Sequence, residues 1–171
     1  MARKLSIMDS GWLMMETRET PMHVGGLALF AVPEDAPSDY MESVYRYMVE
    51  VDGVCRPFSQ KIQSRLPGRL DAAWGDDKNF DIDYHVRHSA LPRPGRVREL
   101  LALVSRLHAQ RLDPSRPLWE SYLIEGLEGN RFALYTKMHH SMVDGMAGMH
   151  LMQSRMASSA DERLPAPWSG E

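Results

Sequence analysis

Apolar residues recur at helical spacing in three segments of the chain. In residues 96–113, RVRELLALVSRLHAQRLD, one side is apolar and arginines occupy the other, which predicts an amphipathic helix that Asp113-Pro114 ends. Its apolar side consists of Leu100, Leu101, Val104, Leu107 and Leu112. Residues 38–53 predict a second helix, capped by Ser38 and ended by Asp52-Gly53. A shorter helix is predicted after Ser6, which with Asp9 has the spacing of a capping box.

Other segments have the composition or alternation of β-strands. Residues 22–32 are rich in β-formers, and Gly25-Gly26 within them indicates a bulge or a close backbone approach. Residues 58–66 are a weaker strand candidate, ended by Pro67-Gly68. In residues 80–91 the alternation predicts a strand with Ile82, Tyr84 and Val86 on one face.

A β-hairpin is predicted in the last third of the chain. Residues 119–126 and 131–139 are both β-rich, and the short connection LEGN makes them antiparallel neighbours. Phe132, Leu134, Thr136 and Met138 should share one face of the second strand, and Ala133, Tyr135, Lys137 and His139 the other. Because helices and strands interleave, the predicted fold is an α/β (α+β layered) domain with a mixed β-sheet flanked by helices.

Composition narrows the functional classes. The chain has 171 residues, of which 43% are hydrophobic and 25% charged, which suits one globular domain. The net charge of −3 and the scattered basic residues give no reason to expect nucleic-acid binding. The single cysteine, Cys55, cannot form an internal disulfide, which favours a reducing cytosol. No signal peptide and no membrane-spanning run are predicted.

The last residues have a different character from the rest. Residues 158–171, SSADERLPAPWSGE, are polar and proline-rich, which is typical of a linker. We therefore predict one domain over residues 1–157, followed by the start of an interdomain linker.

The stretch MHHSMVDGMAG carries the clearest chemistry. The predicted strand delivers His139 and His140 to a sheet end, and Gly145 allows the following loop to turn. Histidine is the natural general base near neutral pH, suited to taking a proton from an alcohol, thiol or amine that attacks a carbonyl. Asp144 could fix a histidine tautomer or pair with an arginine and hold the loop, with Arg116 as a candidate partner.

This stretch has two other interpretations. The histidines could be solvated or hydrogen-bonded residues without a task. They could also ligate a metal together with Asp144, but H-E-x-x-H is absent and adjacent histidines on a strand diverge, so no metal site is predicted. There is no G-x-S-x-G elbow, and Cys55 has no histidine nearby in sequence. A direct reaction between two bound substrates is therefore favoured over a covalent enzyme intermediate.

Residues 139–145, HHSMVDG, match the H-H-x-x-x-D-G signature of the CoA-dependent acyltransferase superfamily, which includes the condensation domains of peptide synthetases. The chain more specifically resembles the bacterial wax ester synthase/diacylglycerol acyltransferase family over residues 5–30, 80–95 and 112–148. Residues 117–120, PLWE, match a second motif of that family, which is thought to be mainly structural.

The resemblance implies a chloramphenicol-acetyltransferase-like half domain that transfers a long-chain fatty acyl group from acyl-CoA to a fatty alcohol or to diacylglycerol. By the family's motif, His140 is the general base, His139 supports the site, Asp144 orients the loop and Gly145 permits the turn. Support is also expected from the second motif and its neighbour, that is, from Arg116, Pro117, Leu118 and Trp119. No cofactor is implied, since acyl-CoA is a substrate. A cytoplasmic enzyme, peripheral at the inner membrane or at lipid inclusions, is expected.

This sequence departs from the family in length. Members have two similar domains with the active site in a tunnel between them, and the second domain carries an Asn-Asp motif that is missing here. The chain is therefore expected to be the N-terminal half, with the C-terminal half as its partner. Two alternatives stay open: a condensation-type enzyme that joins an amine to a carrier-bound acyl group, and a lipid-binding module without activity.

Overall fold

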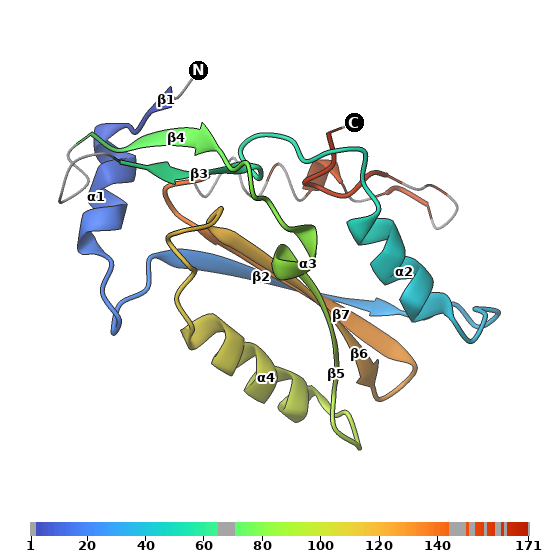
Figure 1. Ribbon diagram of the computed structural model, residues 1–171. Coiled ribbons are helices and arrows are strands. Elements are labelled where there is room, and N and C mark those ends of the chain that lie inside the picture. Colours follow the sequence, from blue (N-terminus) through green and yellow to red (C-terminus); the bar gives the residue numbers. More distant parts are fainter. Residues whose placement is uncertain are drawn as a thin grey trace.

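A four-stranded mixed sheet forms the centre of the chain in a computed structural model (Figure 1). The structure describes residues 3–64, 71–143, 150, 153–155, 157–159, 162 and 164–170. The sheet has the order β2-β7-β6-β5, antiparallel except for the parallel pair β5 and β6. The strands are β2 (His23–Ala31), β7 (Arg131–His139), β6 (Trp119–Leu127) and β5 (Val86–Ala90). The predicted hairpin and the mixed sheet are confirmed.

A smaller antiparallel sheet and the helices α1 to α4 accompany the central sheet. The small sheet has the order β1-β4-β3 and consists of β1 (Arg3–Lys4), β4 (Ala73–Asp76) and β3 (Gln60–Gln63). The helices are α1 (Ile7–Met15), α2 (Tyr40–Val49), α3 (Ile82–His85) and α4 (Val97–Ala109). In Figure 1 the large sheet lies between α4 and a layer that holds the small sheet, α2 and the C-terminal segment.

The two faces of β7 enter two different hydrophobic clusters, as the alternation predicted. Ala133 and Tyr135 pack with Leu100 and other residues of α4. Phe132 and Met138 belong to the second cluster, on the opposite face of the strand. Because His139 follows this alternation, its side chain is on the α4 side of the sheet.

Gly25 of β2 permits the close approach that the Gly-Gly pair indicated. A Cβ atom at this position would lie 2.8 Å from the Tyr135 hydroxyl oxygen. The register between β2 and β7 is continuous from His23 opposite His139 to Ala31 opposite Arg131, so the alternative of a bulge is wrong. The capping box of α1 is confirmed, with the Asp9 amide donating to Ser6 Oγ and the Ser6 amide donating to the Asp9 carboxylate.

Further local predictions were wrong. Residues 82–85 form the short helix α3, because Asp81 accepts a hydrogen bond from the Asp83 amide and starts a turn, and the strand begins only at Val86. Asp39, not Ser38, precedes α2, and it makes no side-chain capping bond. In α4, Leu101 does not share the buried side with Leu100: its exposed fraction is 51%, against 0% for Leu100. This helix also ends at Ala109, before Asp113-Pro114.

The segment predicted as the start of a linker packs against the domain in its described part. Ala166 and Trp168 are buried members of the second hydrophobic cluster. Ser169 forms an isolated β-bridge with Val54. In the segment where a helix was expected to start near Met146, the described residues 150, 153 and 154 are helical, and the others fall mostly outside the residues that the structure describes.

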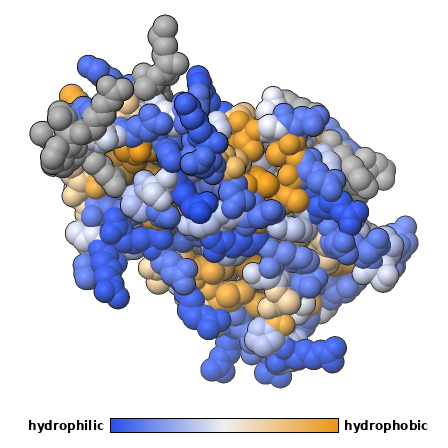
Figure 2. All heavy atoms as spheres, viewed as in Figure 1, coloured by the Kyte–Doolittle hydropathy of each residue, from blue (hydrophilic) through white to orange (hydrophobic). Residues whose placement is uncertain are grey.

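Apolar side chains also reach the surface, and Figure 2 shows them in separate patches among hydrophilic atoms. Helix α1 has no buried residue, and Ile7 and Met14 are 95% and 83% exposed. Within the described residues, no helix is both long enough and apolar enough to cross a bilayer.

The two adjacent leucines of α4 give a matched stability test. Leu100→Ala should lower the free energy of unfolding by about 2–5 kcal/mol, because it removes a fully buried side chain and leaves a cavity. Leu101→Ala, on the exposed side, should change it by no more than about 0.5 kcal/mol. Urea unfolding followed by circular dichroism would measure both. Equal losses would contradict the orientation of α4.

Candidate active site

The histidine motif begins where the central strand β7 ends. The His139 amide donates to the Leu118 carbonyl, N···O 3.0 Å, next to the start of β6. The His140 amide donates to the Met22 carbonyl, N···O 2.9 Å, just before β2. The backbone of the motif is thus held from both neighbouring strands, and each histidine leaves the sheet from a fixed point.

The ring of His139 is buried, with an exposed fraction of 1%. The Ser141 amide donates to its Nδ1, N···N 3.1 Å, and Ser141 Oγ lies 2.7 Å from the same atom. Since Nδ1 accepts a hydrogen bond, the proton of the neutral ring is on Nε2. Burial lowers the pKa of His139 to about 4, so the ring is neutral at pH 7.

Glu16 lies beside this buried histidine, with Oε1 3.7 Å from His139 Nε2. Burial raises the pKa of Glu16, but hydrogen bonds from the Arg111 side chain and the Met22 amide outweigh burial and lower the pKa below its usual value. Arg111 Nη2 is 2.7 Å from Glu16 Oε2. The pair at the histidine is therefore a carboxylate and a neutral N–H group, and the charge of Glu16 is balanced by Arg111.

His140 is placed differently. Its ring is half-buried and stacks on the ring of Trp12 from α1, with centroids 4.6 Å apart and planes 18° from parallel. No described residue makes a hydrogen bond to either of its ring nitrogens. Stacking on Trp12 fixes the plane of the ring.

A layer of buried polar groups lies next to His139 on the α4 side. His23, opposite His139 in the sheet, donates from Nε2 to the His108 carbonyl, N···O 2.7 Å, and burial lowers its pKa. Lys137 is fully buried, and its Nζ donates to the Leu107 and Gln110 carbonyls at 2.9 and 2.8 Å. These carbonyls lie at the C-terminal end of α4, where helix carbonyls lack partners within the helix, and Lys137 supplies hydrogen bonds to them. Arg111 comes just after this end of the helix.

The charge of Lys137 has a buried partner in Glu120, which is 3.3 Å from Nζ. Burial lowers the pKa of Lys137, while the adjacent Glu120 carboxylate acts in the opposite direction. Tyr122 donates to the same carboxylate, O···O 2.6 Å, and its pKa is raised first by burial and then by Glu120. A buried charge without such partners would be strongly destabilising.

The remaining predicted site residues divide into two groups. Asp144 and Gly145 lie outside the residues that the structure describes, so their roles stay predictions. Pro117, Leu118 and Trp119 are buried at the start of β6, and the Leu118 carbonyl holds the His139 amide. Arg116 lies over the Tyr84 ring, 3.9 Å from its centroid, with Nε 3.8 Å from the Asp113 carboxylate. Its pairing with Asp144 stays a prediction.

Sequence reasoning missed four residues that touch the two histidines or their partner. They are Trp12, Glu16, Arg111 and Ser141. Ser141 occupies a variable position of the motif. A serine two residues after a histidine is a local pattern that could have indicated a hydrogen bond to the histidine ring. Trp12, Glu16 and Arg111 are distant in sequence, and no local pattern connects them to the histidines.

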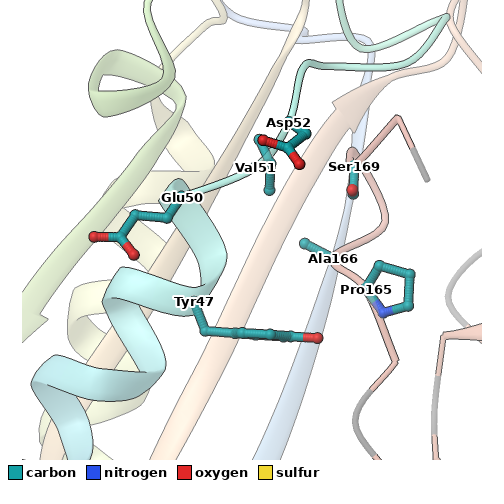
Figure 3. Close-up of a pocket in the computed structure, with 7 residues that line it drawn as sticks. All are labelled: Tyr47, Glu50, Val51, Asp52, Pro165, Ala166 and Ser169. Atoms are coloured by element: carbon teal, nitrogen blue, oxygen red, sulfur yellow. The ribbon is translucent and has the colours of Figure 1, made fainter.

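A pocket of about 110 Å³ lies away from the histidine motif (Figure 3). It is lined by Tyr47, Glu50, Val51, Asp52, Pro165, Ala166 and Ser169. Tyr47 and Asp52 face residues of the C-terminal segment across it. Among the described residues, no group of three or more His, Cys, Asp or Glu side chains could hold a metal ion.

The depressed pKa of His139 makes stability depend on pH. Between pH 6.5 and about 4 the unfolded chain binds a proton at this histidine and the folded chain does not, so acidification through this range favours unfolding. The expected loss is roughly 2–3 kcal/mol at the lower end. Chemical unfolding at a series of pH values would measure it. His139→Gln should flatten the profile in this range, and an unchanged slope would contradict a buried neutral His139.

Comparison with known proteins identifies the family of the chain. The family model of the wax ester synthase/diacylglycerol acyltransferase catalytic domain matches residues 5–170. A Mycobacterium tuberculosis protein named "probable diacylglycerol O-acyltransferase" is 47% identical over 163 residues, 94% of this chain and 36% of its own length.

Solved structures of other proteins are similar to this chain in fold. The wax ester synthase/diacylglycerol acyltransferase from Marinobacter aquaeolei VT8 matches with a TM-score of 0.90 and 42% identity, covering 97% of this chain and 41% of that chain. The first condensation domain of the calcium-dependent antibiotic synthetase shares the fold, with a TM-score of 0.64 and 19% identity over 94% of this chain and 41% of that chain. The chain thus spans about a third of the length of the curated relatives it matches. It belongs to the wax ester synthase/diacylglycerol acyltransferase family.

Proposed function

We propose that this chain supplies the catalytic base of an O-acyltransferase that moves a long-chain fatty acyl group from acyl-CoA to a fatty alcohol, giving a wax ester, or to diacylglycerol, giving triacylglycerol. The observation that carries the proposal is the unequal state of the two histidines. Nδ1 of His139 is already occupied by Ser141 and its Nε2 is buried, whereas the ring of His140 is partly open and oriented by Trp12.

His140 is the residue able to accept a proton from a substrate. A base needs an accessible nitrogen lone pair, and the lone pair of His139 is used by the Ser141 amide. The low pKa of His139, a consequence of burial, also makes it a weak base at pH 7. His139 therefore supports the site: with Ser141 it fixes the backbone from which the His140 ring leaves.

The reaction follows from this assignment. A nitrogen of His140 takes the hydroxyl proton of the acceptor as the alcohol oxygen attacks the thioester carbonyl carbon. The tetrahedral intermediate collapses, the carbon–sulfur bond breaks, and the thiolate of CoA leaves. Protonated His140 can then return the proton to the thiolate. Because free thiols have a pKa of about 8.5, the thiolate is a tolerable leaving group. No acyl-enzyme intermediate is needed.

The roles of Asp144 and Gly145 in this proposal come from the family's motif. Gly145 would let the loop turn after the strand, and Asp144 would hold that loop rather than the base.

The rest of the catalytic machinery is expected outside this chain. Because the chain spans about a third of the curated relatives, we propose that a C-terminal half supplies the other wall of the substrate tunnel and that the chain is inactive without it. Its substrates and products are lipids, so we also propose a cytoplasmic enzyme that meets membranes or lipid inclusions peripherally, through exposed apolar side chains such as those of α1.

The condensation-type reaction remains the second candidate, supported by the shared fold alone. The two reactions differ in acyl donor and acceptor. Activity with free palmitoyl-CoA and a long-chain alcohol, without a carrier protein, is the expected result. An absolute requirement for a carrier-bound acyl group and an amine acceptor would favour the condensation reaction.

Substitution of the two histidines should separate their roles in the natural protein that contains this chain. His140→Ala should lower kcat by several orders of magnitude. Loss of a general base alone typically lowers the rate roughly 10²–10⁴-fold. His139→Ala should be milder, because it removes a support and leaves the base. Ester formation from radiolabelled acyl-CoA would measure both effects.

His150 is a matched control, since it lies in the same region but outside the motif. His150→Ala should retain wild-type turnover. Near-normal turnover by His140→Ala would show that the base is elsewhere. Absence of ester synthesis in the wild-type protein with every acceptor, combined with lipid binding, would favour the non-enzymatic lipid-binding module.

A further inference from the structure

We propose that residues 164–170, called the strap below, position the histidine motif through Trp168, which packs on Trp119 of the PLWE stretch. In this proposal Trp168 is a positioning residue for the acyl transfer and not part of a passive linker. The kinetic test of this proposal rests on the proposed function, and its spectroscopic test does not.

The strap is held to the domain by its backbone and by one large side chain. Trp168 is 2% exposed, and its Nε1 donates to the Met48 carbonyl, N···O 2.8 Å. This carbonyl lies in the last turn of α2, where helix carbonyls lack partners within the helix. The Cys55 amide donates to the Trp168 carbonyl at 2.9 Å, and the Gly170 amide donates to the Gly53 carbonyl at 3.1 Å.

The entry of the strap is fixed as well. Tyr47 of α2 donates from its hydroxyl to the Leu164 carbonyl, O···O 3.3 Å. The strap therefore contacts α2 at Tyr47 and Met48 and runs beside residues 53–55, which the β-bridge between Val54 and Ser169 confirms. A segment with this many backbone partners has a defined path along the domain.

The Trp168 ring completes an aromatic column. It stacks on Trp119 with centroids 5.0 Å apart and planes 26° from parallel. Trp119 in turn stacks on His85 at 4.7 Å, and His85 on Phe80 at 4.9 Å. Phe58 packs edge-on against both tryptophans, at 5.1 and 6.5 Å, and accepts a hydrogen bond from Trp119 Nε1 at its carbonyl, N···O 2.9 Å.

The column is connected to the histidine motif by short covalent and hydrogen-bonded steps. Trp119 is the first residue of β6 and lies opposite Met138, the residue before His139. Leu118, directly before Trp119, accepts the His139 amide. A displacement of the Trp119 ring would therefore move the carbonyl that holds the motif. Active sites are sensitive to such shifts, since a misplacement of about 1 Å can cost roughly 10²-fold in rate.

The test compares Trp168→Ala with Trp168→Phe in the natural protein. Trp168→Ala removes the stack, and kcat should fall roughly tenfold or more while KM changes much less, because the base is displaced and substrate contacts elsewhere remain. Trp168→Phe keeps an aromatic face against Trp119 and should recover most of kcat, although it loses the bond to the Met48 carbonyl. Trp168→Leu replaces the alanine variant if the latter does not fold, with the same expected loss of kcat.

Trp74 supplies the control for general destabilisation. It is 1% exposed and belongs to the same hydrophobic cluster, but among the described residues it makes no ring contact with the column. Trp74→Ala should lower Tm comparably and leave kcat of the folded protein unchanged. Equal losses of kcat in the Trp74 and Trp168 variants, or wild-type kcat in Trp168→Ala, would overturn the proposal.

A spectroscopic readout keeps the strap separate from the proposed function. Ring ¹⁵N resonances of His139 report its tautomer and its bond to Ser141, and they should shift in Trp168→Ala but not in Trp74→Ala. If the wild-type protein makes no ester, the proposed function fails and these resonances still decide whether the strap positions the motif. Unshifted His139 resonances in Trp168→Ala would overturn the proposal without affecting the assignment of His140 as base.

Discussion

The pairing of β7 with a strand on each side is the constraint on which the candidate site depends. Its last residues are held by the Leu118 carbonyl on the β6 side and by the Met22 carbonyl on the β2 side. A strand that ended at a sheet edge would leave one side of the motif free. Here the two histidines leave a strand whose position is fixed from both directions, so adjacent residues can have very different surroundings.

Burial is what makes the two histidines unequal. His139 continues the alternation of β7 into the space under α4, where loss of solvent suppresses its protonation and Ser141 occupies its Nδ1. His140 lies one residue beyond the strand and rests on Trp12 of α1. Glu16, which follows α1, and Arg111, which follows α4, close the space around His139. The elements α1, α4 and β7, which are distant in sequence, therefore give the two histidines their different surroundings.

Aromatic packing connects two motifs that are separate in the sequence. The PLWE stretch and the histidine motif are about twenty residues apart, yet they meet across β6 and β7. Trp119 is buried in a column of rings that reaches from Phe80 to Trp168, so the support of the motif includes a residue near the end of the chain. The stability of this region and the geometry of the site share the same contacts.

Much of this protein follows from local sequence. The hairpin, the faces of β7, the amphipathic helix α4 and the candidate histidines could be predicted, because periodicity and turn residues act over short distances. The local prediction failed at residues 82–85, where a single Asp81 cap outweighed an alternating pattern. The polar, proline-rich composition of the C-terminal residues predicted a linker. Composition does not show that Trp168 packs against Trp119 in the hydrophobic core.

The sequence by itself determined that two histidines stand together at the end of a strand and to which family the motif is similar. Only the tertiary structure decided that His139 is buried and neutral, that Trp12 orients His140, and that Trp168 packs under Trp119. The physical reason is that desolvation and ring stacking depend on which distant residues share a volume. Sequence spacing specifies which side chains leave the same face of an element, and tertiary packing specifies what surrounds them.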